Sequence, residues 1–272
     1  MQEADIQQLL PHSSLLQPLC GLYLDLALHQ QAKHGDVFIY SNYIASLDGR
    51  IALRDAQRQN FSVPQAIANA RDWRLYQELA AQSDIMLTSA RYFRQLSKGC
   101  AQDLLPVGRE KAYEDLQVWR HDQGLKPQPD VMILSASLDI PLASLDALQD
   151  RKIWLVTNAQ ADDHKVRELQ SAGVAVLQVA EERVQGKAIK ALLIEHGYRS
   201  AYMIAGPQVH QTMLADQVLN RLFLTTHLSL LGQDAFYTIL QGSISPVMCE
   251  VESLYWDAVG KQMFAQYVVN PH

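Results

Sequence analysis

The sequence predicts an α/β fold, with a mainly parallel central sheet, helices on both faces and a C-terminal antiparallel hairpin. Two observations lead to this class. Strand-like and helix-like patterns alternate from residue 37 to about residue 228, and such alternation builds βαβ units with parallel strands. Two further runs of alternating polarity, 247–256 and 263–269, lie on either side of Gly260, which predicts an antiparallel pair at the end of the chain.

Local patterns place the individual elements along the chain. Leucines spaced three and four residues apart within 4–32 predict an amphipathic, helical N-terminal extension over residues 1–36. The remainder, residues 37–272, is expected to form one domain, in which short apolar runs predict buried strands. These strands are expected at 37–44, 85–88, 131–134, 153–157, 174–179, 201–204 and 222–228. Helical patterns and stop signals predict helices at 64–82, 109–123, 162–172, 187–196 and from Pro207 to about residue 215.

Composition limits the class of protein and its partners. Of the 272 residues, 48% are apolar and 19% are charged, which is typical of a soluble globular protein with enough chain to bury a core. The net charge of −6, without a cluster of Lys and Arg, argues against nucleic acid as a partner but is compatible with a small anionic ligand. No apolar run approaches the roughly 20 residues of a membrane span, and the N-terminus lacks signal-peptide features.

The cysteines and histidines predict neither disulfides nor a metal site. The three cysteines, Cys20, Cys100 and Cys249, are odd in number and far apart, which matches no disulfide framework and no zinc pattern. No pair of histidines has metal-ligand spacing on one expected helix. A reducing, cytoplasmic location is the simplest interpretation of this cysteine usage.

The end of the first expected strand gathers several groups that could serve a reaction. The apolar run 37–44 leads into a tight turn at Asp48-Gly49. Asn42, Ser46 and Asp48 thereby bring a carboxamide, a hydroxyl and a carboxylate to one strand end, and strand ends are where open α/β sheets bind ligands. On sequence chemistry alone, an ordinary strand exit with an Asx turn is the commoner explanation of this pattern.

Two other strand ends could receive a phosphate, although the GxGxxG and Walker fingerprints are absent. One expected strand runs into Gly206, and Pro207 then suits the first turn of a helix whose backbone N–H groups can bind an anion. Another ends in Thr88 and Ser89, followed by Arg91, which can pair with a phosphate. A plain strand–helix connection and a Ser89 helix cap are the commoner explanations of these patterns.

Five segments, in chain order, resemble motifs of the riboflavin-biosynthesis pyrimidine reductases. That family forms the C-terminal half of a bifunctional deaminase–reductase and has a dihydrofolate-reductase-like fold. The segments are SNYIASLDGRIA at 41–52, LAAQSDIMLTS at 79–89, SASLD at 135–139, IAGP at 204–207 and LNRLFLT at 219–225. The similarity covers roughly residues 37–242, and the zinc-deaminase motifs of the other half are absent. It implies an NADPH-dependent reductase, a small-molecule substrate that is a pyrimidine or related heterocycle, and a homodimer.

The resemblance also implies functions for individual residues. Asp48 would bind substrate hydroxyls or take part in proton transfer, and Asn42 would orient the same group, so these two are the candidate catalytic residues. The nicotinamide would reduce an imine or hemiaminal carbon of the substrate. No metal ligand is implied. The residues expected to bind the cofactor are Ala45, Ser46, Thr88, Ser89, Arg91, Ala205, Gly206, Pro207 and Gln208.

Two departures from the family pattern leave the reaction open. Ile204 stands where the family has a glutamate, and Ala80 stands where it has an arginine, so two polar substrate contacts are expected to be missing. Either the substrate differs from the riboflavin precursor, or the chain is a nucleotide-binding relative without reductase activity. A reductase of a dihydrofolate-like ring is a third possibility. It needs an acidic residue on a helix after the first strands, and no single carboxylate stands out there.

Overall fold

One eleven-stranded sheet organises the part of the chain that the computed structural model describes, which is residues 5–11, 15–54, 60–102, 104–148 and 150–270. The strand order is β2-β1-β13-β14-β11-β3-β10-β6-β7-β8-β9. From β11 to β9 neighbouring strands are parallel, whereas the first four strands in this order pair antiparallel with one another, and β14 pairs antiparallel with β11. The strands are β1 (Ile6–Leu10), β2 (Leu15–Gln17), β3 (Phe38–Ser46), β6 (Ile85–Ser89), β7 (Asp130–Leu134), β8 (Ile153–Thr157), β9 (Ala175–Gln178), β10 (Ser200–Met203), β11 (Arg221–His227), β13 (Cys249–Asp257) and β14 (Gln262–Val269).

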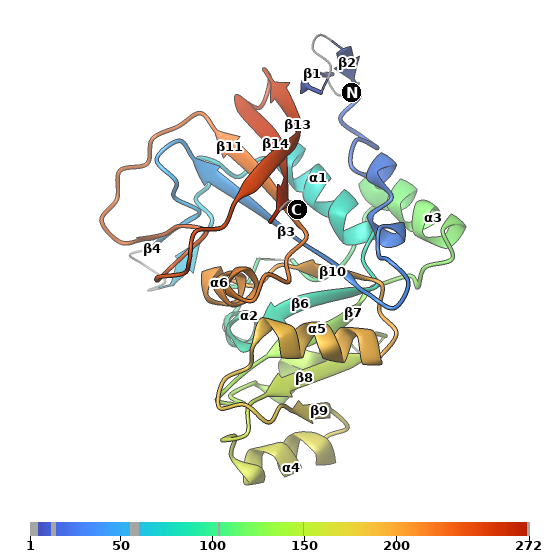
Figure 1. Ribbon diagram of the computed structural model, residues 1–272, viewed down its shortest axis with the longest axis vertical. Helices are drawn as coiled ribbons and strands as arrows, with labels where there is room; N and C mark the ends of the chain where they lie inside the picture. The colour runs from blue at the N-terminus through green and yellow to red at the C-terminus, as the bar shows by residue number, and fades with distance from the viewer. Residues whose placement is uncertain (1–4, 12–14, 55–59, 103, 149, 271–272) are drawn as a thin grey trace.

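Helices cover both faces of this sheet (Figure 1). They are α1 (Ala70–Ala81), α2 (Ala90–Leu96), α3 (Glu114–Asp122), α4 (Asp163–Ser171), α5 (Gly186–Glu195) and α6 (Pro207–Ala215). Leu75 of α1, Leu116 of α3 and Val166 of α4 belong to one cluster of buried side chains. Ile189 of α5 and Met213 of α6 belong to the cluster on the other face. The predicted α/β class, with its mainly parallel sheet and C-terminal antiparallel hairpin, is therefore confirmed.

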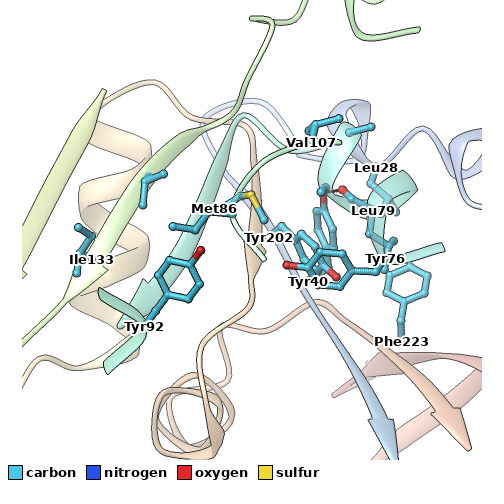
Figure 2. Packing of buried hydrophobic residues seen from close by; sticks show 14 of the residues in the cluster. Leu28, Tyr40, Tyr76, Leu79, Met86, Tyr92, Val107, Ile133, Tyr202 and Phe223 are labelled. Atoms are coloured by element: carbon cyan, nitrogen blue, oxygen red, sulfur yellow. Dashed lines mark hydrogen bonds between the residues drawn. The ribbon is translucent and has the colours of Figure 1, made fainter. Parts of the chain in front are cut away.

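Alternating side chains of the central strands supply these two clusters. Tyr40 of β3 lies in the cluster under α1 and its neighbour Ile39 lies in the other, as the two-residue period of a strand requires. Figure 2 shows Tyr40, Tyr202 and Phe223, from three neighbouring strands, gathered beside Tyr76 of α1. The ring centroids of Tyr40 and Tyr202 are 5.1 Å apart, and those of Tyr76 and Tyr202 are 5.4 Å apart. Burial of side chains of this size, worth roughly 1.5–3 kcal/mol each, holds α1 against the strands that carry the site.

A second, smaller sheet and four short 3₁₀ helices complete the described fold. β4 pairs with both β5 and β12, and the three strands form this second sheet. Its strands, like the seven-residue α2, are too short to show a hydrophobic period, which is why the sequence did not predict them. The strands are β4 (Ala52–Arg54), β5 (Phe61–Ser62) and β12 (Phe236–Tyr237), and the 3₁₀ helices are η1 (Leu24–Leu26), η2 (Leu28–Gln30), η3 (Lys111–Tyr113) and η4 (Leu142–Leu148).

The predicted helical extension over residues 1–36 is wrong. Its described part contains β1, β2, η1 and η2 instead of an α-helix, and β1 pairs antiparallel with β13. Beyond the short hydrogen-bonded turns of η1 and η2, side chains of α1 hold the backbone of this segment. Glu78 accepts from the N–H groups of Gly21 and Tyr23 at 2.6 and 2.9 Å, and Gln82 accepts from Leu28 N–H at 2.8 Å. Of the spaced leucines, Leu19 and Leu22 are buried in this irregular segment, whereas Leu15 and Leu16 are exposed.

Two predicted helices begin later in the chain than expected and are therefore shorter. The helix expected at 64–82 begins at Ala70, where the Asn69 side chain accepts from the N–H groups of Arg71 and Asp72 at 3.1 and 3.0 Å and so caps α1. The helix expected at 109–123 is divided into η3 and α3. Within the described residues, no helix has the length and apolar character needed to cross a membrane.

Candidate active-site cleft

A cleft of about 540 Å³ opens where β3, β10 and β6 end. β10 lies between β3 and β6, although it follows both in the chain, and α1 and α6 lie on opposite faces of the sheet. The point at which the strand order reverses and the helices change faces is the topological switch point, where open α/β sheets bind ligands. Residues of α1, α2, β5 and β12 form the remaining walls.

Most of the residues predicted for the site meet in this cleft. The seven that line it are Asn42, Thr88, Ser89, Arg91, Ala205, Gly206 and Pro207. The four predicted residues outside its lining are Ala45, Ser46, Asp48 and Gln208. Ala45 and Ser46 are buried at the end of β3, and Gln208 is exposed on α6. The two phosphate-binding candidates therefore come together, whereas the turn after β3 does not join them.

Asp48 holds the turn after β3 together instead of facing the cleft. Its carboxylate accepts from the Ser46 hydroxyl, from the Arg50 guanidinium and from the backbone N–H groups of Leu231 and Gly232, the last two at 3.1 and 3.0 Å. These donors, the Ser46 hydroxyl first, lower the pKa of Asp48 to about 2. A carboxylate with so low a pKa and so many donors is poorly suited to carry a proton near neutral pH. The contacts instead tie this turn to the loop before β12.

The carboxyl group that does line the cleft is Asp72, in the first turn of α1. Burial raises the pKa of Asp72 to about 6, against the opposing effect of a hydrogen bond with the Thr225 hydroxyl. Its Oδ1 atom is buried and has no hydrogen-bond partner among the described residues. Sequence patterns do not single it out, because an aspartate in a first helical turn is a common partner of the helix dipole.

Asn42 and Thr225 share the sheet face that carries Asp72. β3 and β11 are parallel with Thr225 beside Ile44, so Asn42, Ile44 and Thr225 project toward α1, as Tyr40 does. The side-chain amide of Asn42 donates to no described residue and lines the cleft. Asn42 therefore lines the cleft together with Asp72, whereas the sequence predicted that Asn42 acts together with Asp48.

The turn before α6 has the form of a cradle for an anionic ligand. Gly206 has φ −67° and ψ 178°, which any residue adopts, and a Cβ added to it would meet no atom within 4 Å. The backbone N–H groups of Ala205 and Gly206 have no acceptor among the described residues. Tyr43 fixes this turn by donating to the Ala205 carbonyl at 3.1 Å. Free donors at a helix start, with open space before them, fit a phosphate of a nucleotide cofactor.

Arg91 adds a positive charge to the same cleft. Its guanidinium carbon lies 5.2 Å from the ring centroid of Tyr237 and 6.0 Å from that of Phe61, and these two rings stack 3.9 Å apart. Among the described carboxylates none forms an ion pair with Arg91. Cation–π contacts position the guanidinium but leave its charge uncompensated, so it can pair with an anion.

The two departures at expected substrate contacts differ in their position relative to the cleft. Ile204 lines it, beside Trp73 and Tyr76, whose rings stack 4.7 Å apart. Ala80 of α1 is fully buried in the hydrophobic core and is not part of the cleft lining. The apolar character of this wall therefore comes from Ile204 and its aromatic neighbours.

The raised pKa of Asp72 predicts how stability depends on pH. The folded protein holds this proton up to about pH 6, whereas the unfolded chain releases it near 3.8. The free energy of unfolding therefore falls as pH rises from about 4 to about 6, by roughly 3 kcal/mol at most, because each pKa unit is worth ~1.4 kcal/mol. Replacing Asp72 by Asn should remove this decline. Urea unfolding of both proteins at pH 4 and pH 8 measures it, and an identical pH dependence would contradict the prediction.

Comparison with known proteins identifies a family model and solved structures that resemble this chain. The family model described as the RibD C-terminal domain matches residues 37–264. A pyrimidine reductase-like protein from Corynebacterium diphtheriae is 17% identical with a TM-score of 0.69, over 87% of this chain and 93% of that one. The riboflavin biosynthesis reductase Rib7 of Saccharomyces cerevisiae is 14% identical with a TM-score of 0.57, over 92% and 98%.

A third similar structure is that of a longer protein. Acinetobacter baumannii RibD is 14% identical with a TM-score of 0.62, and the similarity covers 87% of this chain but 59% of that one. At such identities these structures show a shared fold. The family model, in contrast, matches most of the sequence, including β3, the cleft and β11. The chain therefore belongs to the family of the RibD C-terminal domain.

Proposed function

We propose that this chain is an NADPH-dependent reductase of a pyrimidine or related heterocycle, akin to 5-amino-6-(5-phosphoribosylamino)uracil reductase of riboflavin biosynthesis. One observation carries the proposal: a protonatable buried carboxyl, Asp72, faces the same cleft as the anion cradle at Gly206. An anionic cofactor and a site for proton transfer are what a hydride-transferring enzyme needs together. Membership of the RibD C-terminal domain family supports the assignment.

The residues of two strand ends suit the cofactor. The free N–H groups of Ala205 and Gly206 would receive a phosphate of NADPH, and Arg91 would pair with another. Thr88 and Ser89, at the end of β6, line the cleft with them and offer hydroxyl groups to the same molecule. When bound there, NADPH supplies a hydride.

Asp72 would supply the proton that the reduction also requires. Reduction of a C=N bond adds a hydride to carbon and a proton to nitrogen, and Oδ1 of Asp72 is free to donate that proton. A pKa of about 6 keeps a useful fraction protonated near neutral pH. Thr225 holds the carboxyl group, and the unengaged amide of Asn42 would orient the substrate beside it. Trp73 and Ile204 would give the reacting groups an apolar wall.

The substrate is proposed to differ from the phosphorylated riboflavin precursor because Ile204 replaces a polar contact. A group that loses its hydrogen-bond partner in a closed site binds less well. We expect the wild-type protein to oxidise NADPH poorly or not at all with that precursor. Ile204→Glu should partly restore the reaction, and Ile204→Leu is the matched control. Robust wild-type turnover of the precursor would contradict this prediction.

Asp72 also favours a second candidate function, the reduction of a dihydrofolate-like ring. The acidic residue that this function needs belongs on a helix after the first strands, and α1 carries Asp72 in that position. NADPH oxidation with dihydrofolate and with the pyrimidine precursor, measured side by side, distinguishes the two candidates. NADPH binding without turnover of any pyrimidine, pterin or carbonyl compound would favour the alternative of a nucleotide-binding relative.

On the family resemblance alone we also propose that the protein is cytoplasmic and forms a homodimer. Sedimentation of the purified protein tests the homodimer.

Arg91→Gln should weaken NADPH binding about tenfold or more, since it removes a charged partner from a cofactor phosphate, and tenfold corresponds to ~1.4 kcal/mol. Calorimetric titration with NADPH measures the change. Arg94→Gln is the matched control, because Arg94 lies on the same helix and donates to the Asp139 carbonyl at 2.9 Å, outside the cleft lining. Equal losses in both variants would indicate a general effect of charge rather than a contact by Arg91.

A further inference from the structure

The C-terminal hairpin contacts the start of α1 through a buried polar network. β13 and β14 pair Asp257 with Gln262 on either side of the hairpin turn, and both residues are fully buried. Gln262 projects from the same sheet face as Phe264, which belongs to the cluster under α1. A carboxylate and an amide buried at this place destabilise the fold unless other groups satisfy them. The partners of these two side chains therefore show what the network holds in place.

The amide group of Gln262 is engaged through both its oxygen and its nitrogen. Its Oε1 atom accepts from the side-chain amide of Asn69 at 2.8 Å. Its Nε2 atom donates to Oδ1 of Asn69 at 3.2 Å and to Oδ2 of Asp257 at 2.9 Å. The amides of Asn69 and Gln262 thus exchange two hydrogen bonds, although 193 residues separate them in the chain. This pair fixes the start of α1 against the end of the hairpin.

Asp257 strengthens the same connection. Its Oδ2 atom accepts from Nε of Arg71 at 2.8 Å as well as from Gln262, and its Oδ1 atom accepts from Gly260 N–H at 3.1 Å. A Cβ at Gly260 would come within 2.4 Å of both the Asp257 and the Gln262 side chains, so the glycine leaves room for the network. The carboxylate therefore orients the Gln262 amide and binds the first turn of α1 at the same time.

The network reaches both groups that hold Asp72. Asn69 caps α1 by accepting from Asp72 N–H at 3.0 Å, and Asn69 and Asp72 both line the cleft. Thr225, the hydrogen-bond partner of the Asp72 carboxyl, lies on β11. β11 pairs with β14, where His227 stands opposite Gln262. The hairpin therefore stands beside the cap of the helix that carries Asp72 and beside the strand that carries its hydroxyl partner.

We propose that Gln262 is a positioning residue for Asp72, with Asp257 orienting its amide, so that the hairpin turn fixes where α1 begins and keeps the Asp72 carboxyl buried at the cleft wall. The inference rests on the proposed role of Asp72 as proton donor and extends it to residues outside the cleft lining. Because neither Gln262 nor Asp257 lines the cleft, each acts only through α1.

Two neutral substitutions break the connection from opposite sides. Gln262→Met removes the amide from the hairpin without changing any charge. Asn69→Ser keeps an oxygen that can cap α1 but has no amide to pair with Gln262. Since both variants break the same pair, the double variant should show no larger effect than either single variant.

The pKa of Asp72, followed by NMR titration of its carboxyl carbon in the free protein, is the first measurement. Burial raises this pKa, so a loosened first turn of α1 should lower it by at least about one unit toward its ordinary value. The second measurement is steady-state turnover near neutral pH. A pKa lower by one unit reduces the protonated fraction about tenfold, so kcat should fall about tenfold while NADPH affinity stays unchanged.

Gln266→Met is the matched control. Gln266 lies on the same strand and is 2% exposed, but its amide bonds within the hairpin, to Ser253 at 3.1 Å and to Glu252. Its loss should lower the free energy of unfolding without changing the pKa of Asp72 or kcat. A general weakening of the hairpin is thereby separated from a change at the start of α1.

An unchanged Asp72 pKa in both Gln262→Met and Asn69→Ser would overturn the proposal, as would an equal fall in Gln266→Met. If Gln262→Met does not fold, Asn69→Ser alone decides, because Asn69 is half-buried and serine retains the cap. The titration needs no turnover. A lowered pKa in a protein whose wild type oxidises no NADPH would leave the positioning of Asp72 standing and reject the proposed function.

Discussion

Asp72→Asn is expected to lower turnover at least about 100-fold while leaving the fold and NADPH affinity intact. The expected loss is the low end of what a positioned general acid contributes. The carboxyl is buried in the cleft lining, its Oδ1 atom has no partner among the described residues, and its pKa is about 6, whereas asparagine keeps its shape but cannot release a proton. Steady-state NADPH oxidation with the reducible heterocycle measures the effect.

The pH dependence of turnover separates this chemical role from a structural one. If Asp72 donates the proton, kcat should be constant below about pH 6 and fall about tenfold per unit above it, and Asp72→Asn should lose that dependence. Asp48→Asn is the matched carboxylate control. Its pKa of about 2 leaves it ionised throughout this range, so it should keep the profile. An unchanged profile in Asp72→Asn, or its loss in Asp48→Asn, would contradict the assignment.

Gly206→Leu is expected to abolish detectable NADPH binding without destabilising the free protein. Gly206 has a backbone conformation open to all residues, and a Cβ there meets no protein atom within 4 Å. A leucine side chain would therefore fill only the space in front of the free N–H groups, where the cofactor phosphate is proposed to lie. Calorimetry with NADPH and thermal unfolding without it measure the two effects.

Gly206→Ala serves as the graded control for this variant, since one methyl group should cost much less affinity than an isobutyl group. Unchanged NADPH affinity in Gly206→Leu would show that the cofactor does not approach this turn. A lower unfolding temperature of the free variant would show that the glycine serves folding rather than binding.

The sequence predicts the central sheet well because each strand there is a short apolar run. The N-terminal segment illustrates the limit of such patterns. Its leucines follow a helical spacing, yet Glu78 and Gln82, more than fifty residues away, bind its backbone and hold it in another form. Hydrogen bonds between segments so distant in sequence leave no local signal. The strands of the small sheet, two or three residues long, are likewise too short to show a period.

The candidate site shows the same contrast between features with a local sequence signal and features that depend on distant residues. Gly206 and Arg91 follow strands, and parallel strands end at one edge, so their meeting in the cleft could be anticipated. The role of Asp72 could not be anticipated, because the raised pKa of its carboxyl group depends on burial and its position depends on Thr225, about 150 residues later in the chain. The reverse holds for Asp48, whose family motif is recognisable but whose carboxylate is engaged by Ser46, Arg50 and the loop before β12.

A crystal structure with NADPH bound tests the central claim most directly. We predict that a cofactor phosphate contacts the N–H groups of Ala205 and Gly206, that Arg91 pairs with a second phosphate, and that the nicotinamide lies in the cleft within reach of Asn42 and Asp72. NADPH located outside this cleft, or a nicotinamide directed away from Asp72, would contradict the account.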